Sequence, residues 1–181
     1  RGLEAIARVV DTTLSLHRPP ARGLDLRQVD LDDLEGLIRP VATRQEVTLD
    51  WRNGLVEPVP LDSTLVRQVV LNLALNAVDA TPSGGRVAVE VEEDPAGFRL
   101  TVRDDGPGLG PDATQRLQEL DLDWIDTTAG GIGLGVVIRA VAGLGGRIEV
   151  HHPPDGGSAI TVRLPVDRGE AVIAAVEETA A

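Results

Sequence analysis

The chain has 181 residues and a formal net charge of −12, and all 17 of its basic residues are arginine. So acidic a chain lacks the basic face of a nucleic-acid-binding protein, and without lysine neither a P-loop nor a eukaryotic-type protein kinase site can be built. It contains no cysteine, which excludes disulfides, thiolate metal sites and cysteine nucleophiles. No signal peptide and no apolar run of about 18 residues is present, so nothing in the sequence is predicted to span a membrane.

The first 29 residues are predicted to form a helix and a linker. Five residues recur at the heptad spacing of a helical seam: Leu3, Ala7, Val10, Leu14 and His17. We expect residues 1–18 to be the end of a longer helix, because the chain begins inside this pattern. Residues 19–29 begin with two prolines and are expected to be a linker.

A second helix is predicted over residues 30–45, with Asp30 or Asp32 as its cap. Pro40 lies inside the helical pattern, which predicts either a kink or an earlier end. Residues 47–51 alternate between apolar and polar, which is typical of a half-buried strand.

The stretch from Leu61 to Gly85 is predicted to contain the central helix of the domain. Asp62 or Ser63 can cap its first turn, and a Thr-Pro-Ser-Gly-Gly run ends it. Apart from a narrow set of polar residues, nearly everything in residues 65–78 is apolar, which is typical of a buried helix.

Four polar side chains interrupt the apolar surface of this helix. At 100° per residue they fall within roughly 80° of one another: Gln68, Asn72, Asn76 and Asp79. Buried amides need hydrogen-bond partners, since an unpaired one costs about 1–3 kcal/mol. Either neighbouring backbone or a bound ligand or metal could supply them, and the stretch alone leaves both alternatives open.

Two antiparallel hairpins are predicted after the central helix. The first joins residues 86–92 to residues 98–103, and the second joins residues 147–151 to residues 158–164.

The first hairpin runs directly into the motif Asp104-Asp-Gly106-Pro-Gly108. A carboxylate at a strand end can accept a hydrogen bond from an exocyclic amine, and glycines let a flat ring or the backbone come close. The acidic, weakly patterned residues 111–130 follow, and we expect them to be mobile apart from a short helix near residues 113–120.

The second glycine motif is predicted to be a loop that opens an apolar helix over residues 136–144. Its sequence is Gly131-Ile132-Gly133-Leu134-Gly135. Such a loop at a helix N-terminus presents free amides to a phosphate, and an asparagine oxygen is a suitable ligand for Mg²⁺. Together with the asparagines and Asp104, it predicts a site for Mg-ATP. Neither glycine motif has the G-x-G-x-x-G spacing of a Rossmann site.

In their order and spacing, the three motifs resemble those of the ATP-binding catalytic domain of sensor histidine kinases, within the wider ATPase superfamily of gyrase, Hsp90 and MutL. Residues 67–82 are similar to the family's N box, and the two glycine motifs to its two glycine boxes. The resemblance covers about residues 24–166. We therefore expect the catalytic domain at residues 30–166. The amphipathic pattern of the tail predicts a short helix at residues 167–181.

The resemblance implies the fold. It is α+β, a two-layer α/β sandwich of the Bergerat type. Its mixed, mostly antiparallel sheet would be covered on one face by helices.

The resemblance also implies residue roles. Asn76 would coordinate Mg²⁺, Asn72 would support the metal or its water, and Asp104 would bond the adenine amine. Gly106 and Gly108 would shape the base pocket, and residues 111–130 would be the ATP lid. Asp79 of the central helix would also belong to the nucleotide-binding residues. The second glycine motif completes the set, and its glycines would contact phosphates: Gly131, Ile132, Gly133, Leu134 and Gly135.

The implied activity is phosphoryl transfer from ATP to a histidine, with Asn72 and Asn76 as the catalytic residues. Hydrolytic relatives carry a glutamate at the position of Asn72 as general base, and asparagine cannot take a proton at neutral pH. A response regulator receiver domain would receive the phosphoryl group, and the parent protein would be a homodimer through upstream helices. The domain would be cytoplasmic, in a parent that the sequence leaves either free or attached to the inner membrane.

Two alternatives stay open. A degenerate, non-catalytic member that senses nucleotide or serves as a scaffold is favoured by Asp79, where many members have a basic residue. It is also favoured by Trp124 and Ile125, where the lid of the family has a phenylalanine pair. A gyrase- or Hsp90-like ATPase is opposed by Asn72. In the lid, Arg116 is either a phosphate contact or a solvated side chain.

None of the three histidines lies in the family's phosphoacceptor motif. His17 is followed by Arg-Pro-Pro, and His151 and His152 are expected to be exposed residues at a strand end. We expect the acceptor histidine to lie upstream of Arg1, so that the chain alone would not phosphorylate itself.

Overall fold

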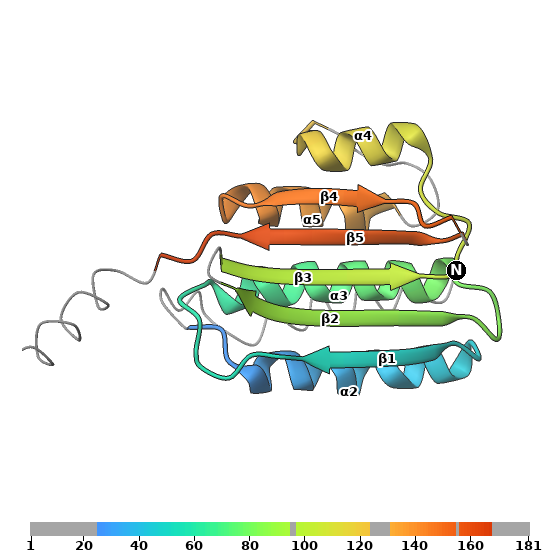
Figure 1. Cartoon of the computed structure of the whole chain (residues 1–181), viewed down its shortest axis with the longest axis horizontal. Helices are drawn as coiled ribbons and strands as arrows, with labels where there is room; N and C mark the ends of the chain where they lie inside the picture. Colours follow the sequence, from blue (N-terminus) through green and yellow to red (C-terminus); the bar gives the residue numbers. More distant parts are fainter. Residues whose placement is uncertain (1–24, 95–96, 124–130, 155, 168–181) are drawn as a thin grey trace, which may run out of the picture.

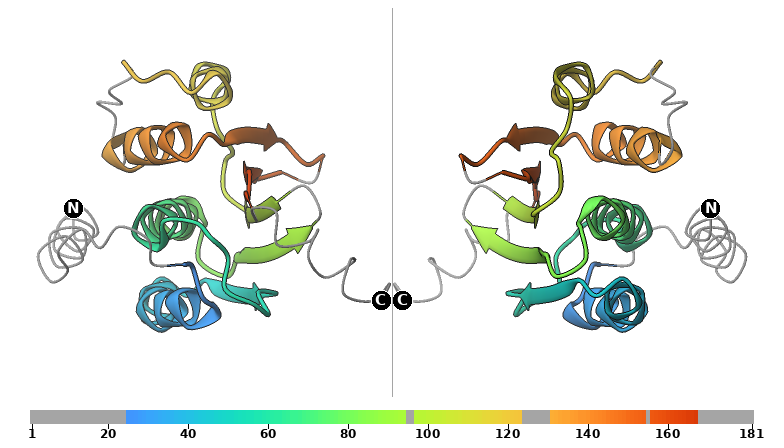
Figure 2. Two further views of the ribbon diagram at one scale, coloured as in Figure 1. Left: turned by 90° about the vertical axis from the view of Figure 1, so that its left-hand side faces the viewer. Right: turned by 90° about the vertical axis from the view of Figure 1, so that its right-hand side faces the viewer.

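The protein is a two-layer sandwich of one sheet and several helices (Figures 1 and 2). The computed structural model describes residues 25–94, 97–123, 131–154 and 156–167. The described strands form one sheet in the order β1-β2-β3-β5-β4. Their bounds are β1 Thr48–Asn53, β2 Arg86–Asp94, β3 Gly97–Asp104, β4 Arg147–His151 and β5 Ser158–Leu164.

The sheet is mixed and mostly antiparallel, as predicted. Strands β1 and β2 are parallel, and the other neighbouring pairs are antiparallel. Burial alternates along β3 and β5, so that one face of the sheet is apolar and the other is polar. The apolar face of the sheet packs against the helices.

Three helices cover that apolar face, and a fourth lies beyond the edge strand β4 (Figures 1 and 2). The covering helices are α2 (Gln28–Arg44), α3 (Ser63–Ala80) and α5 (Gly131–Gly143). The fourth, α4 (Pro111–Glu119), confirms the short helix predicted in this region.

Helix α3 lies between α2 and α5 and is buried, as its composition predicts (Figure 2). Asp62 is its N-cap, and the carboxylate accepts the backbone N–H groups of Thr64 and Leu65 at 2.9 and 3.1 Å. The helix ends at Ala80, where the backbone N–H of the C-cap Thr81 donates to the carbonyl of Ala77.

Helix α2 differs from its predicted bounds. It begins at Gln28, because the carboxylate of Asp30 accepts the N–H of Arg27 at 2.9 Å and closes the first turn. It continues through Pro40 to Arg44, so the alternative of an earlier end is wrong. Pro40 lies on the exposed face, where water can satisfy the carbonyl that loses its partner.

The packed core begins before α2. Leu26 is fully buried, and its backbone exchanges two 2.8 Å hydrogen bonds with Val59. Residues 26–29, which we assigned to a linker, therefore contribute to the domain. The helices predicted for residues 1–18 and 167–181 lie outside the described residues.

Within the part of the chain that the structure describes, no helix combines the length and the apolar character needed to cross a membrane.

The cap of α3 is open to a stability test. We expect Asp62→Ala to lower the free energy of unfolding by about 1 kcal/mol, because two first-turn amides lose their acceptor. Urea denaturation measures the difference. Glu57→Ala removes an exposed carboxylate from the preceding loop and should change the free energy by less than about 0.5 kcal/mol. Equal losses in the two variants would contradict the cap.

Candidate functional site

The first site feature is a buried carboxylate where two neighbouring strands meet. Asp104 ends β3, Ser158 begins β5, and the two residues are register partners. Asp104 is only 6% exposed. One carboxylate oxygen accepts the N–H of Gly106 at 2.8 Å, and the other accepts the Ser158 hydroxyl at 2.5 Å. These two donors hold the carboxylate in one orientation.

Ser158 is a site residue that sequence reasoning missed. No motif contains it, and it comes to Asp104 only through the register of two strands that are 54 residues apart at this point. A signal was nevertheless present. Ser158 occupies the inward-facing position in an alternation that continues with Ile160, Val162 and Leu164, and a polar residue among inward positions needs a partner.

The glycines of the first motif allow close backbone approach. A Cβ atom at Gly106 would lie 2.8 Å from the carbonyl oxygen of Ala80, so this loop packs directly against the C-terminal end of α3. Gly157 faces the same loop with φ +82°, and a Cβ atom there would lie 1.9 Å from the Asp104 carbonyl oxygen. Gly108 lies beside Gly157. The first glycine motif, α3 and the start of β5 are thus joined at one place.

The two asparagines lie half-buried on α3, and their amides differ. The Asn72 amide nitrogen donates to the carbonyl of Gln68 at 2.7 Å, so for this group the backbone is the partner. The Asn76 amide nitrogen is buried and has no hydrogen-bond partner among the described residues. An unpaired buried amide costs about 1–3 kcal/mol, and a ligand could offset this cost.

The second glycine motif is helical, which corrects the loop that we predicted. Helix α5 begins at Gly131, so the motif forms its first turn instead of preceding it. Glycine costs about 1 kcal/mol per position in a helix. Packing offsets this cost, because Leu134 is buried and α5 lies along α3 (Figure 2).

Gly133 brings this motif to the asparagines. A Cβ atom on Gly133 would lie 3.1 Å from the Asn72 side-chain oxygen and 3.1 Å from the Asn76 side-chain nitrogen. The missing side chain therefore lets the first turn of α5 come close to Asn72 and Asn76 of α3. Asp79, also predicted for the site, is exposed one residue before Ala80, and no described contact joins it to the other site residues.

The described part of the predicted lid is anchored to the domain. Leu117 of α4 is fully buried, and the Thr114 hydroxyl lies 3.2 Å from the Nε2 atom of His152, which is exposed as expected. Arg116 donates to Asp112 at 3.0 Å and to Asp121 at 2.7 Å, and these hydrogen bonds raise the pKa of Arg116. Its guanidinium is therefore engaged within this region.

Trp124 and Ile125 of the predicted lid lie outside the described residues.

The chain is similar in sequence to known proteins. A family model described as histidine kinase-, DNA gyrase B-, and HSP90-like ATPase matches residues 61–168. The sensor histidine kinase ZraS of Escherichia coli (strain K12) is 33% identical over 171 residues, which cover 91% of this chain and 36% of the relative. The sensor histidine kinase TmoS of Ectopseudomonas mendocina is 30% identical over 182 residues, which cover 94% of this chain and 19% of the relative. The chain thus spans about a third or less of these relatives.

Solved structures of histidine kinases have a similar fold. Full-length ShkA in complex with AMPPNP is 25% identical with a TM-score of 0.69, covering 91% of this chain and 35% of that chain. The nucleotide-free catalytic domain of the histidine kinase ThkA also has a TM-score of 0.69, and covers 80% of this chain and 97% of that chain. At 18% identity, this second likeness shows the fold alone.

The Asp104–Ser158 pair generates a stability prediction. Ser158→Ala should lower the free energy of unfolding by about 1–3 kcal/mol, because a buried carboxylate oxygen loses its donor. Ser83→Ala is the matched control, since that hydroxyl also donates to a carboxylate, of Glu46 at 2.6 Å, but on the exposed surface. The control should lose less than about 0.5 kcal/mol in the same denaturation experiment. Losses of the same size would refute the role of Ser158.

Sequence, fold and site geometry lead to one assignment. The family model covers more than half of the chain and includes all three motifs. The two-layer sandwich is the fold of histidine kinase catalytic domains, and the similar curated proteins include sensor histidine kinases. The chain therefore belongs to the histidine kinase-, DNA gyrase B-, and HSP90-like ATPase family, and within it to the catalytic domains of sensor histidine kinases.

Proposed function

We propose that this chain binds Mg-ATP and, as the catalytic domain of a sensor histidine kinase, transfers the γ-phosphoryl group to a histidine side chain. The observation that carries the proposal is the convergence of three motifs on α3. Gly133 lies against the asparagine pair, and Gly106 lies against the end of the same helix beside Asp104.

Asp104 is suited to recognise adenine. Each carboxylate oxygen accepts one hydrogen bond from the protein and retains capacity for another. Because Gly106 and Ser158 already fix the carboxylate, little conformational entropy is lost when it accepts an exocyclic amine. The adjacent Gly106 and Gly108 let this loop pack closely against Ala80 and Gly157, which fixes the position of the carboxylate.

The asparagine pair and the first turn of α5 are suited to a polyphosphate with its metal. The unpaired Asn76 amide fits such a group, and the missing side chain of Gly133 brings the first turn of α5 next to both asparagines. The first amides of a helix have no partner within it, so the start of α5 offers donors for phosphate oxygens. When bound, Mg²⁺ would neutralise charge that develops on the phosphates.

Most ligands of such a metal would not come from the protein. Among the residues with described positions, no group of three or more carboxylate or imidazole side chains could hold a metal ion. The asparagine oxygens would act with phosphate and water, which is how Mg²⁺ is usually bound. A chain of net charge −12 also needs a cation to offset its repulsion of a polyphosphate.

Asn72 favours transfer over hydrolysis. Its amide nitrogen is engaged with the carbonyl of Gln68, and a carboxamide cannot accept a proton from water at neutral pH. An acceptor that brings its own nucleophilic nitrogen, such as histidine, does not need that base. Catalysis would then consist of positioning and charge neutralisation.

The names of the relatives extend the proposal to a relay. As sensor histidine kinases, the relatives support a histidine as the phosphoryl acceptor and a response regulator as the protein that receives the group from it. An acceptor on an upstream helix and a homodimeric parent rest on the resemblance of the motifs alone.

Titration calorimetry with a non-hydrolysable ATP analogue tests the nucleotide site. We expect binding that depends on Mg²⁺ and that Asn76→Ala weakens at least tenfold, or about 1.4 kcal/mol. The free energy of unfolding of this variant should stay equal or rise, because an unpaired buried amide is removed. Gln28→Ala, an exposed amide on α2, is the control and should change neither quantity.

Two outcomes would overturn the proposal. Absence of binding at high analogue concentration would favour the alternative that the domain is a non-catalytic scaffold. Steady ATP hydrolysis without any histidine acceptor would favour the ATPase alternative.

Base recognition is tested separately. Asp104→Asn should reduce affinity for the adenine analogue at least tenfold and leave affinity for the corresponding guanine analogue unchanged, because only the adenine amine needs the carboxylate. Competition calorimetry gives both constants, and a retained cooperative melting transition shows that the variant is folded. An equal loss for both bases would contradict recognition by Asp104.

A further inference from the structure

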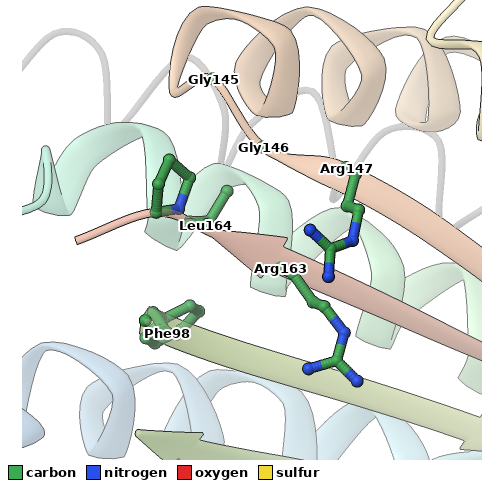
Figure 3. A pocket seen from close by; sticks show the side chains of 8 residues that line it. Phe98, Gly145, Gly146, Arg147, Arg163 and Leu164 are labelled. Atoms are coloured by element: carbon green, nitrogen blue, oxygen red, sulfur yellow. The ribbon is translucent and has the colours of Figure 1, made fainter. Parts of the chain in front are cut away.

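The two edges of the sheet differ in what covers them. Helix α4 lies beyond β4 (Figure 1). On that side Arg147 and Arg163 lie next to each other, and one oxygen of Glu149 accepts the Nε–H groups of both at 3.2 and 3.3 Å (Figure 3). Strand β1 forms the other edge, at the bottom of Figure 1, and no described strand pairs with its outer side. Such an edge presents backbone donors and acceptors that another strand can use.

The peptide groups of β1 alternate between β2 and the open edge. The Thr48 N–H donates to the Gly85 carbonyl at 2.9 Å, so the even-numbered residues direct their peptide groups toward β2. A contact from α2 agrees with this assignment, because the Nη1 atom of Arg39 donates to the Leu49 carbonyl at 3.3 Å from the outer side. Three residues therefore direct their peptide groups outward: Leu49, Trp51 and Asn53.

A second copy of β1 can pair with this edge in an antiparallel arrangement about a two-fold axis. When the axis passes through Trp51, Leu49 lies opposite Asn53 of the second copy, and all outward peptide groups meet. Asp50 then lies opposite Arg52, twice. A shift of the second strand by two residues, the smallest that keeps the peptide groups matched, places either Asp50 opposite Asp50 or Arg52 opposite Arg52. Opposite charges stabilise such a pair and like charges destabilise it, so charge selects the axis at Trp51.

Asp50 and Arg52 are available for this contact. Within the chain they make only surface ion pairs with β2, Asp50 with Arg86 at 3.4 Å and Arg52 with Glu90 at 3.5 Å. Their side chains are 46% and 80% exposed. In the proposed register they form the pairs without backbone hydrogen bonds, in which facing side chains come closest.

The helix layer has the same complementarity. The Asn53 amide donates to Asp32 of α2 at 2.8 Å, and Arg39 of α2 contacts Leu49. Because Asn53 lies opposite Leu49 of the second copy, Asp32 comes beside Arg39 of the second copy. Arg39 also bonds to Glu35 of its own helix, and its side chain is 50% exposed. The charges of both layers therefore favour the same axis.

We propose that β1 is a self-association surface, at which two copies of this chain join their sheets into one with the two-fold axis at Trp51. The interface is isologous, since each copy contributes the same residues. Charged residues usually protect an edge strand from pairing, but here they are complementary to themselves. An interface of one short strand and one helix belongs to the small class, below about 1,200 Å², so we expect a weak and reversible dimer.

Sedimentation equilibrium of the whole chain over a concentration series tests the proposal. The salt concentration should be about 0.15 M, at which screening over about 8 Å limits the repulsion between two chains of net charge −12. We expect the mass to rise with concentration from that of one chain toward that of two. Arg52→Asp and Asp50→Arg should each weaken the dimer at least about tenfold, because like charges then meet twice across the axis.

The variant that combines both substitutions is the decisive one. It restores opposite charges across the axis and should recover most of the lost affinity. Arg103→Asp, which makes the same change of charge on the polar face of β3, is the control and should leave the dissociation constant unchanged. A cooperative melting transition shows that each variant is folded.

Amide hydrogen exchange locates the contact. The Trp51 and Asn53 amides should exchange more slowly as the concentration rises. The Thr48 amide, which is already bonded to Gly85, should not respond. A chain that stays monomeric up to its solubility limit would overturn the proposal. A dimer that survives both single substitutions, or a combined variant as weak as the single ones, would also overturn it.

Discussion

The burial of α3 is the constraint on which the rest of the site depends. The helix is enclosed by α2, α5 and the sheet, so a polar group on its buried surface costs free energy unless it finds a partner (Figure 2). The amide of Asn72 bonds to its own helix, and Asn76 faces α5 at a residue without a side chain. The position of the second glycine motif therefore follows from the packing of α3.

Strand register fixes the other half of the site. Asp104 can be buried only because β5 begins opposite it with a hydroxyl donor and because the next loop turns an amide back toward it. Gly157 permits this, since any side chain there would collide with the Asp104 backbone. The proposed recognition of a base therefore depends on the pairing of β3 with β5.

Local patterns predicted the elements that are stabilised locally. The apolar composition of α3, its Asp62 cap and the alternation of both hairpins were sufficient, because each signal lies within one element. The predictions failed where contacts between residues far apart in the sequence determine the structure. The helical start of α5 at Gly131 depends on packing against α3, and the partnership of Ser158 with Asp104 depends on strand register. The proposed roles of Asn72 and Asn76 stay predictions.

If the proposed function holds, the unpaired Asn76 amide connects the stability of the fold to ligand binding. Burying it costs the domain free energy that an apolar residue would not cost, and native proteins retain such a cost mainly where a ligand offsets it. A ligand that bonds to this amide in the folded state alone must stabilise the fold by mass action. The same helix that organises the core would then be most stable when the nucleotide is bound, so that folding and binding reinforce each other through one side chain.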